Sequence, residues 1–165
     1  MLVPQSVGLA EPARPTGGQH AISQRPIDLA VGEDRRARRS SHLDLLHADG
    51  RLSDRDAALQ AVLAREQTRS TGIGLGLAVP HGKSRACAAL AMAVGKPAEP
   101  MEFDAIDGKP CSFIVLLTSP IDETGPHIQA LAAVSRLWQN AAFRQGVLEA
   151  KSADQLYAAF EQHQA

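Results

Sequence analysis

The chain of 165 residues lacks the features that mark several specialised classes of protein. Its two cysteines, Cys87 and Cys111, match no metal or redox spacing, so buried reduced thiols in a cytoplasmic protein are expected. Lysine and arginine number 17 against 18 aspartates and glutamates, and the net charge of -1 excludes a generally basic surface for nucleic acid. No stretch approaches the roughly 18 apolar residues of a membrane span, and the first residues do not resemble a secretory signal. The length suits one domain with its own core, and neither membrane insertion nor nucleic-acid binding is expected.

Nucleotide-binding loops are also missing, although residues 69–84, RSTGIGLGLAVPHGKS, resemble one at first sight. A P-loop ending in Gly82-Lys83-Ser84 needs glycine at position 77, which is Leu77. Pro80 would lie inside that loop and has no N–H to donate. The dinucleotide pattern fails as well, because Gly76 comes one position early. The stretch is therefore interpreted as a glycine-rich turn followed by a strand over residues 75–79.

Two regions of different composition divide the chain. Residues 1–42 contain prolines, paired glycines and a short arginine run without a sustained apolar period, so we expect an irregular or disordered segment. Residues 43–165 have the composition of a globular domain.

The globular part alternates helix and strand signals. Ser53 is the expected N-cap of a helix that continues to Arg65-Glu66. Three further helices are expected over residues 128–138, around 143–148, and from a cap at Ser152 to Phe160. Strands are expected over residues 75–79, 90–94 and 111–118, with a short edge piece at 101–103. This order predicts the α/β class, a layered sandwich with a mixed, mainly parallel β-sheet flanked by helices.

Two histidines occupy positions suited to chemistry. His81 follows the end of the 75–79 strand and is flanked by Pro80 and Gly82. His127 follows the longest apolar strand at the start of a helix. Loops beyond the carboxyl ends of parallel strands converge on one crevice, so the two rings are expected to face each other. The remaining histidines, His20, His42, His47 and His163, are interpreted as bystanders.

Several kinds of site could use a histidine pair. A histidine at a helix start is often only a cap or a surface group, and the pairing is what favours a site. Zinc would need further ligands that the sequence does not supply, and a serine hydrolase would need a G-x-S-x-G elbow. Two imidazoles with glycine-rich amides and an arginine best suit a phosphoryl group carried covalently on one ring.

The motifs of this region resemble a known family. Arg65-Glu66, Ser70-Thr71-Gly72-Ile73-Gly74, Pro80-His81-Gly82, residues 103–110 and Gly125-Pro126-His127 are similar to the type 2 enzyme IIA domains of the bacterial sugar phosphotransferase system. That group includes fructose, mannitol and nitrogen-regulatory members, and the resemblance covers residues 43–163.

The resemblance implies a role for each matching residue. His81 would accept a phosphoryl group from the phosphocarrier protein HPr, His127 would donate a hydrogen bond to it, and Arg65 would be a charge partner or loop organiser. The implied phosphoryl-binding loop consists of Ser70, Thr71, Gly72, Gly74, Gly76 and Gly82. Neither a metal nor another cofactor is implied.

Three functions remain open at this point. The protein could pass its phosphoryl group to an enzyme IIB for sugar uptake, or it could be a regulatory module whose partners depend on phosphorylation. A non-catalytic relative, like the cytoplasmic domains of some anion transporters, is disfavoured by the intact His81 and His127. Residues 1–42 depart from the family, which begins with a strand and a helix; a shifted reading frame and a divergent extension would both give this composition. Loss of that strand would leave one sheet edge uncovered.

Overall fold

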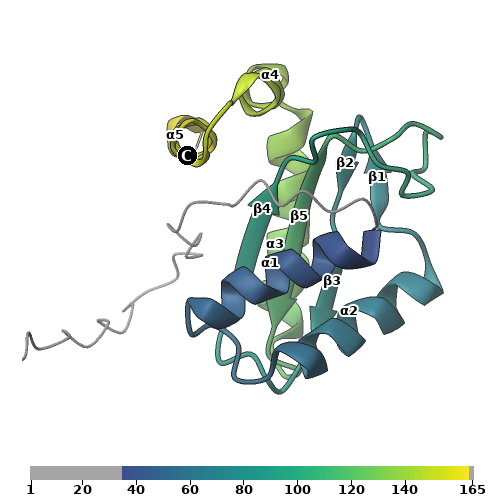
Figure 1. The fold of residues 1–165 in the computed structure, drawn as a ribbon, viewed down its shortest axis with the longest axis vertical. Helices are drawn as coiled ribbons and strands as arrows, with labels where there is room; N and C mark the ends of the chain where they lie inside the picture. The colour runs from purple at the N-terminus through teal and green to yellow at the C-terminus, as the bar shows by residue number, and fades with distance from the viewer. Residues whose placement is uncertain (1–34, 164–165) are drawn as a thin grey trace, which may run out of the picture.

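The computed structural model describes residues 35–163. Five helices and five strands lie within them, and they form helical layers around one sheet (Figure 1). In chain order these elements are α1 (Arg35–Ala48), α2 (Arg55–Thr68), β1 (Gly72–Gly74), β2 (Leu77–Ala78), β3 (His81–Lys83), β4 (Ala91–Gly95), β5 (Phe113–Ser119), α3 (Thr124–Gln139), α4 (Ala141–Glu149) and α5 (Ala153–His163).

Strand β5 is the centre of the sheet. It pairs in parallel with β2 and β3, and β4 pairs with it in antiparallel orientation. Strand β1 extends the sheet through an antiparallel hairpin with β2. All seven residues of β5 are buried, as expected for a strand covered on both faces. The predicted α/β class with a mixed sheet flanked by helices is confirmed.

The alternation of side chains along β5 contributes to hydrophobic clusters on both faces of the sheet. Phe113, Val115 and Leu117 face the cluster formed with α3, α4 and α5. Leu116 lies on the other face, in a cluster with residues of α1, α2 and β4. The sheet is thus a middle layer, with α1 and α2 on one face and α3 on the other (Figure 1).

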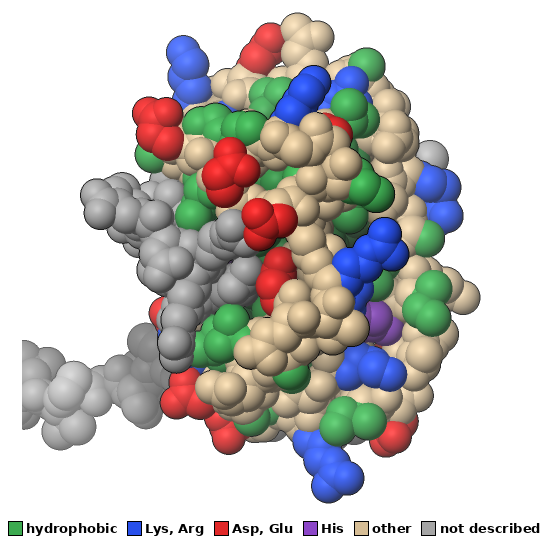
Figure 2. Space-filling view, turned by 90° about the vertical axis from the view of Figure 1, so that its right-hand side faces the viewer, with side chains coloured by type: hydrophobic (Ala, Val, Ile, Leu, Met, Phe, Trp, Pro, Cys, Tyr) green, Lys and Arg blue, Asp and Glu red, His purple; other side chains and the backbone are tan. Residues whose placement is uncertain are grey.

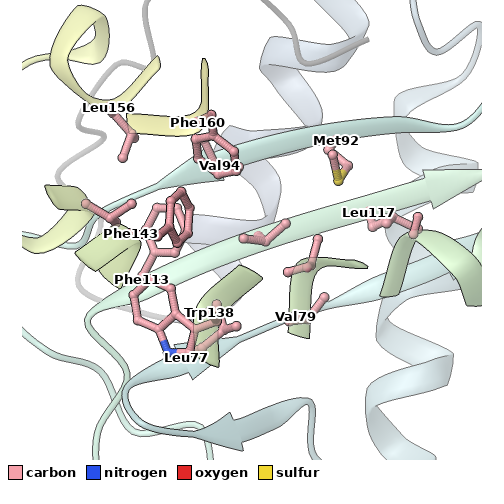
Figure 3. Packing of buried hydrophobic residues seen from close by; sticks show 14 of the residues in the cluster. Leu77, Val79, Met92, Val94, Phe113, Leu117, Trp138, Phe143, Leu156 and Phe160 are labelled. Carbon is pink, nitrogen blue, oxygen red and sulfur yellow. The ribbon is translucent and has the colours of Figure 1, made fainter. Parts of the chain in front are cut away.

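Most of the few aromatic residues gather in the first of these clusters (Figure 3). Phe113 stacks on Trp138 with ring centroids 5.2 Å apart, and Phe143 meets Phe160 edge-on at 5.0 Å. The indole N–H of Trp138 donates to the carbonyl of Leu75, 3.1 Å away. This cluster fixes α3, and therefore its first turn, against the sheet.

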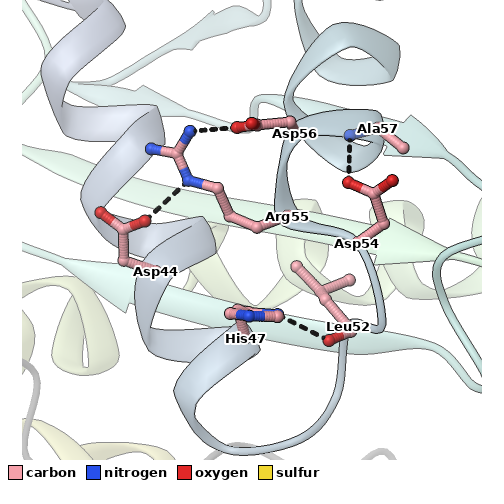
Figure 4. Close-up of polar contacts among 7 residues, drawn as sticks. All are labelled: Asp44, His47, Leu52, Asp54, Arg55, Asp56 and Ala57. Atoms are coloured by element: carbon pink, nitrogen blue, oxygen red, sulfur yellow. Dashed lines mark hydrogen bonds and ion pairs between the residues drawn. The ribbon is translucent and has the colours of Figure 1, made fainter.

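A polar corner joins α1 to α2 (Figure 4). The Arg55 guanidinium contacts the carboxylates of Asp44 and Asp56 at 2.7 and 2.6 Å. The N-cap of α2 is Asp54, whose side chain accepts from the N–H of Ala57 at 2.9 Å. The expectation that Ser53 is the cap is wrong, because its hydroxyl donates instead to the carbonyl of Ala86.

The expected boundaries differ from the structure in three places. Helix α1 begins at Arg35, so the boundary expected at residue 42 falls inside a helix, while residues 1–34 lie outside the described part. Helix α2 continues past Arg65-Glu66 to Thr68. The single strand expected over residues 75–79 is also wrong: Leu75 and Gly76 have positive φ angles of 53° and 78° and form the hairpin turn. The chain then continues through Pro80 into β3, so His81 is the first residue of a further strand.

Candidate active site

His81 is held in one orientation by its own strand. Its Nδ1 lies 2.7 Å from the carbonyl oxygen of Val79. A carbonyl only accepts, so Nδ1 carries the proton and Nε2 keeps a lone pair. Partial burial lowers the pKa of His81, and the positive charge of Arg65 lowers it further. The ring is therefore neutral near pH 7 and has a nucleophilic nitrogen.

His127 lies beside this ring, in the first turn of α3. The two ring centroids are 5.4 Å apart and the planes are inclined at 55°. His127 is only 6% exposed, and its Nδ1 lies 2.7 Å from the hydroxyl of Ser119, the last residue of β5. Burial is the main reason that its pKa falls to about 4, with smaller effects from the charge that His81 carries when protonated and from the charges of Lys83 and Arg65. Both imidazoles are thus uncharged under ordinary conditions.

Two cations flank the histidine pair. Arg65, in the last turn of α2, donates to the carbonyl of Arg69 at 3.1 Å. Lys83, in β3, donates to the hydroxyl of Thr124 at 2.8 Å. Within residues 35–163 neither cation has a carboxylate partner. On the face shown in Figure 2, a histidine reaches the surface next to Lys and Arg side chains. The site therefore contains two cations that form no ion pair within these residues, and the carboxylate of Glu66 is a nearby charge of opposite sign that acts on His81.

A chain of hydrogen bonds connects α2 to His81. The carboxylate of Glu66 accepts from the hydroxyl of Thr71 at 3.0 Å and from its N–H at 3.3 Å. The carbonyl of Thr71 accepts from the N–H of Val79 at 2.9 Å, and the carbonyl of Val79 accepts from His81. Glu66 and Thr71 thus position the backbone that orients the reactive ring.

The glycines of the expected phosphoryl-binding loop have other roles. Leu77 and His81 pair with Phe113 and Leu117, four residues apart on β5, which corresponds to about 13 Å. Gly74 at the end of β1 lies near Asp107, and Gly76 in the hairpin turn lies near Ser112; both are beyond Leu77 and too far from His81 to contact a group on its ring.

The contacts of the remaining loop residues are those of packing and backbone order. A Cβ on Gly72 would lie 2.7 Å from the Cα of Ala105, and one on Gly82 would lie 2.8 Å from the backbone nitrogen of Val62. Ser70 donates its hydroxyl to the carbonyl of Phe103 and accepts from the N–H of Gly72. The two glycines, which have no Cβ, thus allow the backbone to approach Ala105 and Val62 closely.

Three residues near the histidines had no role assigned from the sequence: Glu66, Lys83 and Ser119. Lys83 is two residues from His81, and side chains at that spacing share a face of a strand. The spacing that places Lys83 beside His81 is thus visible in the sequence, but it is informative only if residues 81–83 form a strand. For Ser119 the sequence shows only that it follows the strand expected over residues 111–118.

The described residues define what the site can do. Within residues 35–163 no three His, Cys, Asp or Glu side chains are grouped so that they could hold a metal. A neutral imidazole with a free Nε2, a second imidazole and two cations suit transient attachment of an anionic group to histidine. Together, the fold and the site define a class of protein, the α/β domains that carry a phosphoryl group.

Comparison with known proteins gives the family. The model of the phosphoenolpyruvate-dependent sugar phosphotransferase system EIIA 2 family matches residues 40–163. The chain belongs to this family, whose members are phosphoryl-carrying components of that system.

No helix within residues 35–163 is long and apolar enough to cross a membrane.

Relatives include both transport and regulatory proteins. A fructose-specific EIIA component of Haloferax volcanii is 40% identical over 110 residues, which cover 67% of this chain and 71% of that protein. A nitrogen regulatory protein of Escherichia coli is 36% identical over 99 residues, 59% of this chain and 61% of the relative. A fructose-specific EIIABC component of Bacillus subtilis is 33% identical, and the match covers 72% of this chain but only 19% of that protein.

Solved structures share the fold. The nitrogen regulatory protein IIA-Ntr of Neisseria meningitidis has a TM-score of 0.71 at 29% identity, covering 79% of this chain and 88% of the other. The mannitol IIA of Escherichia coli has a TM-score of 0.66 at 17% identity, covering 79% and 91%, and therefore supports the fold alone.

Proposed function

We propose that His81 is the phosphoryl acceptor of this EIIA domain and that an HPr-type phosphocarrier in the cytoplasm is its donor. The observation that carries the proposal is the pair of facing imidazoles, in which the bond from His81 Nδ1 to Val79 leaves Nε2 as the nucleophile. Membership of the EIIA 2 family gives the class of reaction, and the tautomer of His81 supports Nε2 as the attacking atom.

The transfer is an in-line displacement between two histidines. The lone pair of His81 Nε2 forms a new P–N bond while the P–N bond of the donor breaks, and the donor's nitrogen takes back its electron pair. The Nδ1 proton stays on His81, where the Val79 carbonyl stabilises the positive charge that develops on the ring. The protein mainly contributes position and fixed charge.

His127 has a supporting role in this proposal. The Ser119 hydroxyl lies 2.7 Å from Nδ1 of His127 and 3.4 Å from the Pro120 carbonyl, so its proton goes to the closer acceptor, Nδ1; the Nε2 of His127 then carries the ring proton and can donate to a phosphoryl oxygen. The positive charge of Arg65, on the last turn of α2, favours the anionic group in the same place. Its bond to the Arg69 carbonyl also orders the start of the loop.

The phosphoryl group could then follow two routes. Transfer to an enzyme IIB would drive sugar uptake, as the name of the fructose-specific relative indicates for that protein. The similarity to nitrogen regulatory proteins favours the second route, in which phosphorylation controls binding to target proteins. Up to two negative charges added at a half-exposed histidine would change that surface for any partner.

Labelling tests the acceptor. Incubation with enzyme I, HPr and labelled phosphoenolpyruvate should label the wild type with an acid-labile, base-stable bond. His81→Ala should remain unlabelled, while His127→Ala should accept phosphate about 10²-fold more slowly, because a hydrogen-bond donor to the developing charge is lost. His47→Ala is the matched control, since that exposed histidine bonds only the Leu52 carbonyl at the α1–α2 corner (Figure 4). Full labelling of His81→Ala would refute the assignment.

A further inference from the structure

Lys83 is placed to contact a group on His81. The two residues are the ends of β3, with Gly82 between them, so their side chains leave the same face of the strand. Their Cα atoms are about 6.6 Å apart at the usual rise of a strand. Gly82 faces the backbone of α2, whereas His81 meets His127 and Lys83 meets Thr124, both on α3.

The present partner of Lys83 is a weak one. Thr124 is the first residue of α3 and offers a neutral hydroxyl at an exposed position. A phosphoryl dianion is a stronger acceptor for an ammonium group than a hydroxyl, because charge-assisted bonds are roughly twice as strong as neutral ones. No ion pair within residues 35–163 competes for Lys83.

We infer that Lys83 is a phosphoryl-binding residue, whose ammonium exchanges the Thr124 hydroxyl for an oxygen of the phosphoryl group on His81. This inference rests on the proposed function of His81 and adds a residue to it. The flexible four-carbon stem of lysine allows the exchange without movement of the backbone. The influence of Lys83 on the pKa of His127 is consistent with its closeness to the pair.

A small phosphoryl donor separates this role from protein docking. Phosphoramidate contains a P–N bond but has no protein surface, so a lysine that only binds HPr would not affect it. Lys83→Gln should slow labelling of His81 by phosphoramidate up to about 5-fold, less than loss of a buried donor would, because Lys83 is exposed. It should also raise the pKa of the phosphoryl group measured by phosphorus NMR, since the cation that favours the dianion is gone.

Arg85→Gln and Thr124→Val are the controls. The first removes the same charge from an exposed residue two positions along the chain, and the second removes the neutral partner without removing the cation. Both should be labelled at least as fast as the wild type. Equal rates in Lys83→Gln and Arg85→Gln, with an unchanged phosphoryl pKa, would overturn the role of Lys83 while leaving His81 as acceptor. A wild type without label on His81 would overturn both proposals.

Discussion

A single methyl group on Gly82 should separate the two elements that build the active site. The Cβ of Gly82→Ala would lie 2.8 Å from the backbone nitrogen of Val62 and 2.9 Å from the carbonyl carbon of Ala61. Ordinary contacts begin near 3.4 Å, so β3 and α2 must move apart by 3.4 minus 2.8, or 0.6 Å. Both atoms belong to the backbone of a helix, and no change of rotamer can relieve the contact.

The displacement has consequences for stability and for rate. Overpacking of this kind costs about 1–3 kcal/mol of unfolding free energy. Strand β3 carries His81, and α2 carries Arg65 one turn after Ala61, so the same movement shifts the acceptor relative to the cation. Because a misplacement of about 1 Å can cost 10²-fold in rate, a shift of this size should slow phosphorylation roughly 10-fold.

Gly125→Ala is the matched control for this prediction. Gly125 lies in the first turn of α3, two residues before His127, and an added Cβ would meet no heavy atom within 4 Å. Urea unfolding and the rate of labelling by phospho-HPr would be measured for both variants. A Gly82→Ala protein as stable and as fast as the wild type, or an equal loss in Gly125→Ala, would refute the close-packing argument.

Two further predictions concern the histidine pair and the hairpin turn. The pKa of His127 is about 4 in the folded chain and about 6.5 in the unfolded chain. As the pH falls, the unfolded chain therefore binds this proton before the folded chain does, which favours unfolding. The free energy of unfolding should fall by at most about 3 kcal/mol as the pH drops from 6.5 to 4. His127→Gln should flatten that part of the profile, and NMR titration of the wild-type ring above pH 6 would contradict the depressed pKa. Leu75→Asn should raise the unfolding free energy by up to about 1 kcal/mol, because Leu75 is 48% exposed and strained at a φ of 53°, where asparagine is better tolerated. Ile73→Asn in the neighbouring strand should not, and a lower melting temperature for Leu75→Asn would refute the strain argument.

The elements with strong local signals could be predicted from the sequence. The apolar run around Ile114 marks β5, and Asn140 and Ser152 supply capping side chains at α4 and α5. The hairpin could not be predicted, because its turn places Leu75 in a conformation that leucine rarely adopts. Tertiary contacts hold it there: the Leu75 N–H donates to Asp107 and its carbonyl accepts from Trp138.

The candidate site shows the same limit. The histidine pair could be expected from two motifs, but the function of each glycine could not, since sequence does not distinguish a glycine that faces a ligand from one that faces a helix. Gly82 lies between His81 and Lys83 and yet contacts α2. The positions of Lys83 and Glu66 near the histidines follow from the register of β3 and from the hydrogen bonds of Thr71. Both depend on the packed fold and cannot be read from the sequence.

The electrostatics of the site suit a carrier that must both accept and release a phosphoryl group. Burial keeps His127 uncharged, so in the proposed role it would contribute a hydrogen bond and no full positive charge. The nearby cations contact neutral acceptors, and interactions of exposed charges are each worth about 1 kcal/mol or less. A buried, fully charged clamp would hold the phosphoryl group more tightly and slow its departure. In the proposed phosphorylated state, modest attraction from several directions would instead leave the P–N bond of His81 at a free energy from which transfer to a partner remains possible.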